Sequence, residues 1–175
     1  MPNLIQQIDE AILFFIQNHL KNPALDRSMV LITSLGNAGL LWIIIAFLLL
    51  FIKQYQKCGL LLICALAFSK FIGDDILKPL LGRVRPCNKF TEIAILIHTP
   101  HSPSFPSGHT AVGFACATIL YHCNRRLGIC GFVVATLIAF SRMYLFVHYP
   151  TDILGGILLG ILTSRILLTC IKSLD

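Results

Sequence analysis

The sequence predicts an all-α protein, a polytopic membrane bundle of about five transmembrane helices plus an N-terminal amphipathic helix at the membrane interface. Two observations predict this class. First, 56% of the 175 residues are hydrophobic and only 13% are charged, whereas about a quarter of a soluble domain is charged. Second, the apolar residues form stretches close to the ~20 residues that a membrane-spanning helix needs. A mean hydropathy of +0.80 leaves too little polar surface to cover a soluble globule, and the length fits one domain over residues 1–175.

The first element expected is an amphipathic helix over residues 4–20, within an interfacial N-terminal segment that covers residues 1–28. Its apolar positions are interrupted by Asp9, Glu10 and Gln17, a pattern typical of a helix that lies in the interface rather than crossing the membrane. An ordinary cap packed on the bundle is an equally weighted alternative. No basic segment precedes this run, so we do not expect a cleavable signal peptide.

Two spans follow in the first half of the chain. The first covers residues 29–52, but residues 33–39 are polar or glycine-rich. Residues 40–52 alone are too short to cross a bilayer. The less apolar half, which contains residues 33–39, therefore either enters the membrane or packs as a separate helical turn beside the bundle. The second span covers about residues 58–77.

Residues 78–107 form the longest polar connection and are predicted to be an active-site loop. Three further spans follow, at about residues 108–122, 127–147 and 152–171. In the last of them, Gly156 and Gly160 form a G-x-x-x-G pair, which predicts close packing against another helix.

Three polar motifs lie at the ends of these spans: KPLLGRVRP at 78–86, PSGH at 106–109 and SRMYLFVHYPTD at 141–152. The third and fourth spans make one round trip across the membrane, so all three motifs emerge on the same side. The opposite side carries the short basic connections, with Lys53, Lys57, Arg125, Arg126 and Lys172. The positive-inside rule therefore predicts a plasma-membrane protein whose motifs face the extracytoplasmic side.

The cations of these motifs are suited to a phosphate group. Lys78 and Arg85 are seven residues apart, about two helical turns, although Pro79 biases Lys78 away from helical geometry. Arg142 comes from another helix and can complete a cage around a tetrahedral anion. Any one of them could instead extend to lipid headgroups, but the three together with two histidines favour a site. Headgroup contacts are expected for the remaining two cations of the loop, Arg83 and Lys89.

The PSGH motif places Ser107, Gly108 and His109 where a helix begins. Free backbone N–H groups and the helix dipole favour an anion at such a position. Ser107 is also a plausible N-cap residue. It is not expected to be a nucleophile, because the surrounding residues do not form the G-x-S-x-G pattern.

His148 and Asp152 lie four residues apart across a proline. An aspartate that holds one ring nitrogen selects the tautomer and leaves the other nitrogen free to attack. Structural or interfacial roles are expected for two other histidines, His19 and His122. A metal or headgroup contact is open for His98 and His101, but their spacing from His109 matches no standard zinc site.

Together, the patterns Lys-x6-Arg-Pro, Pro-Ser-Gly-His and Ser-Arg-x5-His-x3-Asp resemble those of the type 2 phosphatidic acid phosphatase family. These are integral-membrane lipid phosphatases related to vanadium haloperoxidases and glucose-6-phosphatase. The small size is similar to that of bacterial undecaprenyl-diphosphate phosphatases. Larger relatives have six spans, and this sequence lacks a counterpart of the first.

The resemblance implies that His148 attacks phosphorus to form a phosphohistidine, oriented by Asp152, while His109 protonates the leaving oxygen and then activates water. It also implies a set of residues that hold the phosphoryl oxygens: Lys78, Arg85, Arg142, Ser107 and Gly108. Three cations already neutralise a phosphate, so we expect no metal and no cofactor.

The expected partner is a membrane lipid that carries a phosphate or diphosphate. Nucleic acid is not expected, since the +6 net charge is spread between apolar spans, and no obligate protein partner is evident. Undecaprenyl diphosphate is the preferred substrate, with phosphatidylglycerophosphate or the lipid A phosphate as alternatives. A non-catalytic lipid-phosphate binder or transporter is the alternative of another class.

Overall fold

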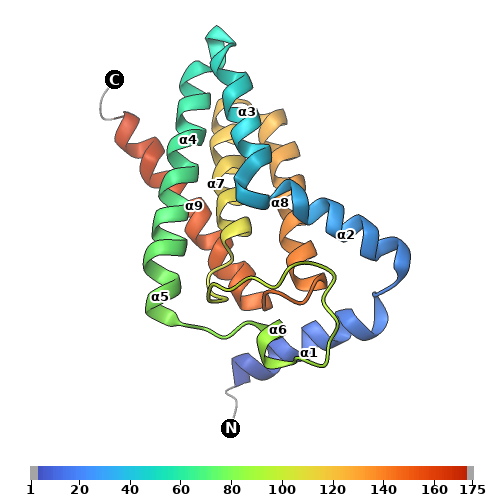
Figure 1. The fold of residues 1–175 in the computed structure, drawn as a ribbon. Coiled ribbons are helices and arrows are strands. Elements are labelled where there is room, and N and C mark those ends of the chain that lie inside the picture. Colours follow the sequence, from blue (N-terminus) through green and yellow to red (C-terminus); the bar gives the residue numbers. More distant parts are fainter. Residues whose placement is uncertain (1–3, 173–175) are drawn as a thin grey trace.

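The computed structural model describes residues 4–172, and their side chains as far as residue 170. Within this part of the chain every regular element is helical. Long helices lie side by side along the bundle, whereas the first helix lies across one end of it (Figure 1). The elements are α1 (Leu4–His19), α2 (Pro23–Leu35), η1 (Asn37–Gly39), α3 (Leu40–Leu50), η2 (Lys53–Tyr55), α4 (Gln56–Lys70), η3 (Phe71–Leu77), α5 (Lys78–Leu81), α6 (Pro86–Lys89), α7 (Gly108–Cys123), α8 (Arg125–Tyr144) and α9 (Pro150–Lys172).

The central helix is α7, which packs against α4, α8 and α9. Its contact with α9 is close because both sides present small residues. A Cβ atom added at Gly156 would lie 2.7 Å from the carbonyl oxygen of Ser107, and one added at Gly160 would meet the carbonyl oxygen of Ala111. The predicted G-x-x-x-G packing is therefore confirmed.

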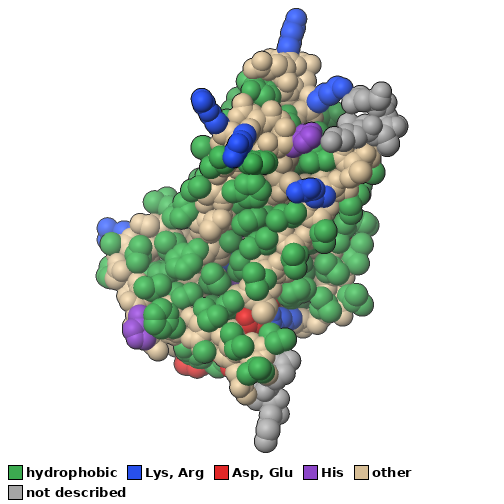
Figure 2. Space-filling model, turned by 180° about the vertical axis from the view of Figure 1, so that it is seen from behind, with side chains coloured by type: hydrophobic (Ala, Val, Ile, Leu, Met, Phe, Trp, Pro, Cys, Tyr) green, Lys and Arg blue, Asp and Glu red, His purple; other side chains and the backbone are tan. Residues whose placement is uncertain are grey.

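Two helices, α8 and α9, are each long and apolar enough to cross a membrane. The pair α2–α3 also qualifies if its two helices are counted as one span bent by 45°. Figure 2 shows hydrophobic side chains over most of one face, with several Lys and Arg side chains toward the end opposite α1. The helical membrane bundle is thus confirmed, whereas the number of five spans stays a prediction.

The less apolar half of the predicted span 29–52 contains a break in the helix. Ala38 and Gly39 have φ values of 51° and 72°, which interrupt the helical hydrogen bonding between α2 and α3. Non-helical backbone at membrane depth needs protein or water around it rather than lipid. Here the break lines a cavity inside the bundle.

Lys78 is helical, with φ −61° and ψ −51°, so the expected effect of Pro79 is wrong. The reason is local: Pro79 lies in the first turn of α5, directly after the π-helical segment η3. The N–H of Lys78 bonds to the carbonyl oxygen of Gly73, five residues back, and this wider π-helical turn accommodates the proline ring. Lys78 consequently continues the line of α4 toward the interior.

The predicted amphipathic helix is present as α1. Its outer face exposes large hydrophobic side chains, among them Ile5, Ile8 and Phe15 at 52–59%. Such a face suits the interface and favours this prediction over a fully packed cap. However, Asp9 lies on the inner face and is 0% exposed, a position that the sequence pattern did not predict.

Candidate active site

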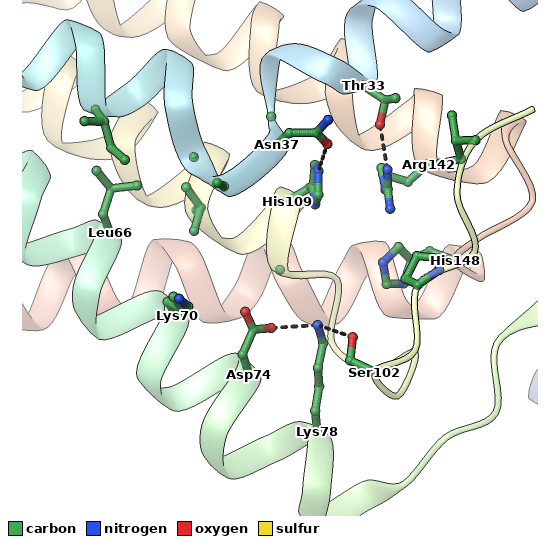
Figure 3. A pocket seen from close by; sticks show the side chains of 18 of the residues that line it. Thr33, Asn37, Leu66, Lys70, Asp74, Lys78, Ser102, His109, Arg142 and His148 are labelled. Carbon is green, nitrogen blue, oxygen red and sulfur yellow. Dashed lines mark hydrogen bonds and ion pairs between the residues drawn. The ribbon is translucent and has the colours of Figure 1, made fainter.

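A cavity of about 850 Å³ lies inside the bundle, and all three polar motifs contribute to its wall. Figure 3 shows His109, Arg142 and His148 around the same space, with Lys78 facing them from the continuation of α4. The predicted site residues that line the cavity are Lys78, Arg85, Gly108, His109, Arg142 and His148.

His148 lies in the short connection between α8 and α9 and is 1% exposed. Its Nδ1 is 3.4 Å from Oδ2 of Asp152, and its Nε2 is 3.0 Å from Nη1 of Arg85. A guanidinium group can only donate, so Nε2 accepts this hydrogen bond. The ring proton therefore lies on Nδ1, toward the carboxylate, as the predicted couple requires.

Asp152 lies in the first turn of α9 and is held from several directions. Its Oδ2 accepts hydrogen bonds from the hydroxyl of Ser104 at 2.5 Å and from the backbone N–H of Tyr149 at 2.8 Å. Its Oδ1 accepts one from Arg83 at 2.6 Å. These contacts hold the carboxylate in place beside the imidazole of His148.

Burial lowers the pKa of His148 to about 3, because the charged imidazolium would lose its hydration. The hydrogen bond to Asp152 opposes this shift, and the charges of Arg85 and Arg142 add to it. His148 is thus neutral at pH 7, with a lone pair on Nε2.

The three predicted cations are all buried, at 2–7% exposure. The Lys78 ammonium pairs with Asp74 at 2.6 Å. Arg85 donates to the carbonyl oxygens of Ser102 and Val147, at 2.7 and 2.9 Å. Much of this positive charge is offset only by neutral acceptors, so an anion in the cavity would be strongly favoured.

Arg142 is the third of these cations and comes from the last turn of α8. Its Nη1 donates to the hydroxyl of Thr33 at 2.7 Å. Its buried Nε has no hydrogen-bond partner among the described residues. An anion that approached through the cavity could satisfy this donor.

His109 lies in the first turn of α7, and its Nε2 is 3.2 Å from the side-chain oxygen of Asn37. It lines the same cavity as His148. The fold has therefore brought two imidazoles from separate motifs to one space.

Ser107 differs from expectation. It occupies the N-cap position of α7, but its side chain makes no capping hydrogen bond. Its hydroxyl instead accepts from Thr110 at 2.9 Å, and its N–H donates to the carbonyl oxygen of Asp152 at 3.1 Å. Ser107 is 0% exposed and is not among the residues that line the cavity. Its contact with phosphate stays a prediction.

The two remaining cations of the loop pair with carboxylates of the protein. The headgroup expectation is therefore wrong for Arg83, whereas it stays a prediction for Lys89, whose side chain is 41% exposed. Arg83 pairs with Asp9 and Asp152, and Lys89 pairs with Glu10. The cause is α1, which folds back along the loop and brings two carboxylates to it.

Ser102 and Ser104 of the loop hold Arg85 and Asp152 and escaped the sequence patterns. So did three further supports: Asp9, Thr33 and Asn37. Each comes from the N-terminal third of the chain, more than 70 positions before the residue that it holds. The only available signal was the unusual polarity of the predicted span around Thr33 and Asn37.

His98 lines the cavity, and its ring lies 5.6 Å from that of His101. Among the described residues, no three His, Cys, Asp or Glu side chains form a group that could hold a metal ion. The role of this pair therefore stays open.

Comparisons with known proteins agree with these motifs. The sequence profile of the PAP2 superfamily matches residues 58–174. The undecaprenyl-diphosphatase of Sulfolobus acidocaldarius is 31% identical over 85% of this chain and 71% of its own length. Phosphatidylglycerophosphatase B of Bacillus subtilis is 34% identical over 91% of this chain and 81% of its own length.

A lipid A 4′-phosphatase of Bacteroides thetaiotaomicron is 29% identical over 91% of this chain and 75% of its own length. Among solved structures, a transmembrane PAP2-type phosphatidylglycerolphosphate phosphatase from Bacillus subtilis has a TM-score of 0.81 and 30% identity. That match covers 99% of this chain and 89% of the other. The chain thus belongs to the PAP2 superfamily and is a membrane lipid phosphatase of that family.

Proposed function

We propose that the protein hydrolyses the phosphate or diphosphate headgroup of a membrane lipid through a phosphohistidine at His148, with undecaprenyl diphosphate as the preferred substrate. One observation carries the proposal. A neutral imidazole oriented by Asp152 and a second imidazole, His109, line one cavity together with three buried cations.

In the first step, Nε2 of His148 attacks phosphorus and the bond to the leaving oxygen breaks. With the anionic phosphate in the cavity to favour its charged form, His109 holds a proton and donates it to that oxygen. In the second step, neutral His109 takes a proton from water, whose oxygen attacks phosphorus. The phosphorus–nitrogen bond then breaks, phosphate leaves and the electron pair returns to Nε2.

The cations supply the charge stabilisation that phosphoryl transfer needs. Lys78, Arg85 and Arg142 approach the cavity from three different elements and can bind separate oxygens. Asp152 stabilises the positive charge that develops on His148 during attack. Because the protein itself provides this neutralisation, we propose catalysis without a metal ion.

The cavity also has an apolar wall, which supports a lipid substrate. Side chains of α3, α4 and α7 form this wall: Ile43, Ile63, Leu66, Ala67 and Val112. An acyl or isoprenoid chain could lie there while its phosphate lies among the cations. The connections outside the loop 78–107 are short, leaving little protein to recognise a large headgroup, which favours a simple diphosphate.

A second candidate substrate is phosphatidylglycerophosphate. It is favoured by the 34% identity to phosphatidylglycerophosphatase B over 91% of the chain. Both substrates present a terminal phosphate at the membrane surface, so the same residues would act on either.

We further propose that the cavity faces the extracytoplasmic side of the plasma membrane. Support comes from the basic connections at the other end of the long helices, which carry Lys53, Lys57, Arg125 and Arg126. The side chain of Lys172, which entered the same prediction, lies outside the described residues.

The test is phosphate release in detergent with a chelator present, from isoprenoid diphosphates and glycerophospholipid phosphates in parallel. Wild type should release phosphate, whereas His148→Ala and His109→Ala should not. His122→Ala is the matched control, because His122 lies at the other end of α7 and is exposed.

Activity that survives His148→Ala would reject the nucleophile, and activity lost only with chelator would indicate a metal site. Lipid binding by wild type without phosphate release would support the binder or transporter instead. The relative kcat/KM values across the panel decide between the two candidate substrates.

A further inference from the structure

Asp9 is a buried carboxylate in a helix whose outer face is apolar. It is 0% exposed, and a charge removed from water to this extent needs close partners. Its Oδ1 accepts from the backbone N–H of Thr151 at 3.0 Å, and its Oδ2 accepts from the Thr151 hydroxyl at 2.5 Å. Oδ2 also accepts from Nη2 of Arg83 at 2.6 Å. These contacts tie α1 to the first turn of α9.

Arg83 connects this carboxylate to the one beside His148. Its Nη2 donates to Asp9 and its Nη1 donates to Oδ1 of Asp152, both at 2.6 Å. Its guanidinium also lies over the ring of Tyr149, 4.2 Å from the centroid. A planar group held at both ends and on one face has little freedom to move.

The two oxygens of Asp152 have different partners. Oδ2 faces Nδ1 of His148, while Oδ1 faces Arg83. Asp9 shares the charge of Arg83 with Asp152. Without Asp9, the full guanidinium charge would act on Asp152 and compete with His148 for that carboxylate.

We propose that Asp9 and Arg83 are positioning residues, which hold Asp152 in the orientation that His148 needs for attack. This inference rests on the proposed function, in which His148 is the nucleophile. It assigns to α1, which lies outside the matched residues 58–174, a direct part in the site. Neither residue touches the substrate, so their effect is on kcat rather than on substrate affinity.

The experiment measures kcat and KM for phosphate release by wild type, Asp9→Asn, Arg83→Gln and the double variant in detergent. Asp9→Asn should lower kcat about tenfold, the lower end of the range for groups that orient a reacting ligand, with KM nearly unchanged. Since Asp9 acts through Arg83, the double variant should be no slower than Arg83→Gln alone. If the loss of kcat in the double variant equalled the product of the losses in the two single variants, the proposal would be overturned.

Glu10→Gln is the matched control. Glu10 is the next residue of α1 and pairs with Lys89, away from the cavity. Glu10→Gln should keep the wild-type kcat. A loss of kcat equal to that of Asp9→Asn would show that only the packing of α1 on the bundle matters for activity. If Asp9→Asn does not fold, Arg83→Lys is measured in its place. The lysine ammonium cannot bridge two carboxylates in the way that the planar guanidinium of Arg83 does. Unchanged kcat in Arg83→Lys would also overturn the proposal.

A second readout does not depend on turnover. The ¹⁵N shifts of His148, assigned with His148→Gln, report the tautomer and the bond from Nδ1 to Asp152. They should change in Asp9→Asn and not in Glu10→Gln. If the wild type releases no phosphate but Asp9→Asn still changes the ¹⁵N shifts of His148, the proposed function is rejected and the positioning network is retained. Unchanged shifts in Asp9→Asn would reject the network even if the wild type is active.

Discussion

The N-terminal third and the remainder of the chain contribute differently to the site. Residues 58–172 carry every group proposed to touch phosphate, on α5 to α9 and their connections. Residues 4–57 carry two polar side chains that hold members of that set, Thr33 and Asn37. They also carry Asp9, which reaches the site through Arg83. The N-terminal third thus supplies supports but no reactive group, whereas the remainder supplies the reactive groups together with supports of its own, such as Arg83 and Ser104.

The difference follows from what each role demands. A phosphoryl-transfer site needs specific groups, namely an imidazole–carboxylate couple, a second imidazole and several cations, so it leaves a recognisable motif. A support needs only one hydrogen-bonding atom at the right point, and almost any polar residue can provide it. The following predictions test this division.

The largest effect is expected for the nucleophile. His148→Gln should lower kcat at least a thousandfold, on the order of the loss seen when a catalytic group that acts covalently is removed. The measurement is single-turnover phosphate release. A residual rate within tenfold of wild type would break the comparison, because the reactive group would then lie elsewhere.

The largest effect on stability should appear at acid pH. His148 has a pKa of about 3 in the folded protein against 6.5 as its ordinary value, so between these values only the unfolded chain binds the proton. The free energy of unfolding should therefore fall as pH decreases from about 6.5 toward 3. The midpoint of thermal unfolding in detergent, at pH 7.5 and 4.5, checks this.

His148→Gln should lose less stability than wild type over the same pH interval, whereas His122→Gln should behave like wild type. Equal losses in all three proteins would show that His148 is not the group responsible.

An intermediate effect is expected at Asn37, the support of His109. Asn37→Ala removes the 3.2 Å contact to Nε2, so His109 loses its orientation and kcat should fall about tenfold. Ser34→Ala is the control, because Ser34 is exposed on α2 and its hydroxyl donates to the carbonyl oxygen of Leu31 in the same helix. A thousandfold loss would make Asn37 part of the reactive set and break the division.

A smaller effect is expected at Thr33. Thr33→Val keeps the shape but removes the 2.7 Å hydrogen bond to Arg142. KM for the lipid should rise about fivefold, within the ~1.5 kcal/mol expected for a hydrogen bond to a charged group, while kcat changes less. A fall in kcat alone would instead connect Thr33 to the chemical step.

The smallest effect is expected for the ion pair of Glu10 and Lys89. It is partly exposed, with Lys89 at 41%, and such pairs contribute less than about 1 kcal/mol. Lys89→Gln should therefore leave both the unfolding midpoint and kcat nearly unchanged. A clear loss of activity would mean that the loop 78–107 depends on α1 through more than Asp9.

The motifs and the helix pattern were accessible from the amino-acid sequence because they depend on neighbours in the chain. Hydropathy over about twenty residues predicts helices in lipid, and four residues separate His148 from its carboxylate. The order of the spans predicted that both histidines lie on the same side, and the structure places them in one cavity. Close packing at the G-x-x-x-G pair followed from side-chain size, whereas α7 as the partner helix is known from the structure.

Other features depend on contacts between distant segments. Arg83 lies 74 positions from Asp9, and no local pattern distinguishes it from a cation that reaches lipid headgroups. The burial of Ser107 likewise depends on how α7 meets α9. A buried charge is stable only where another segment supplies its partner, and which segment does so is settled when the helices pack.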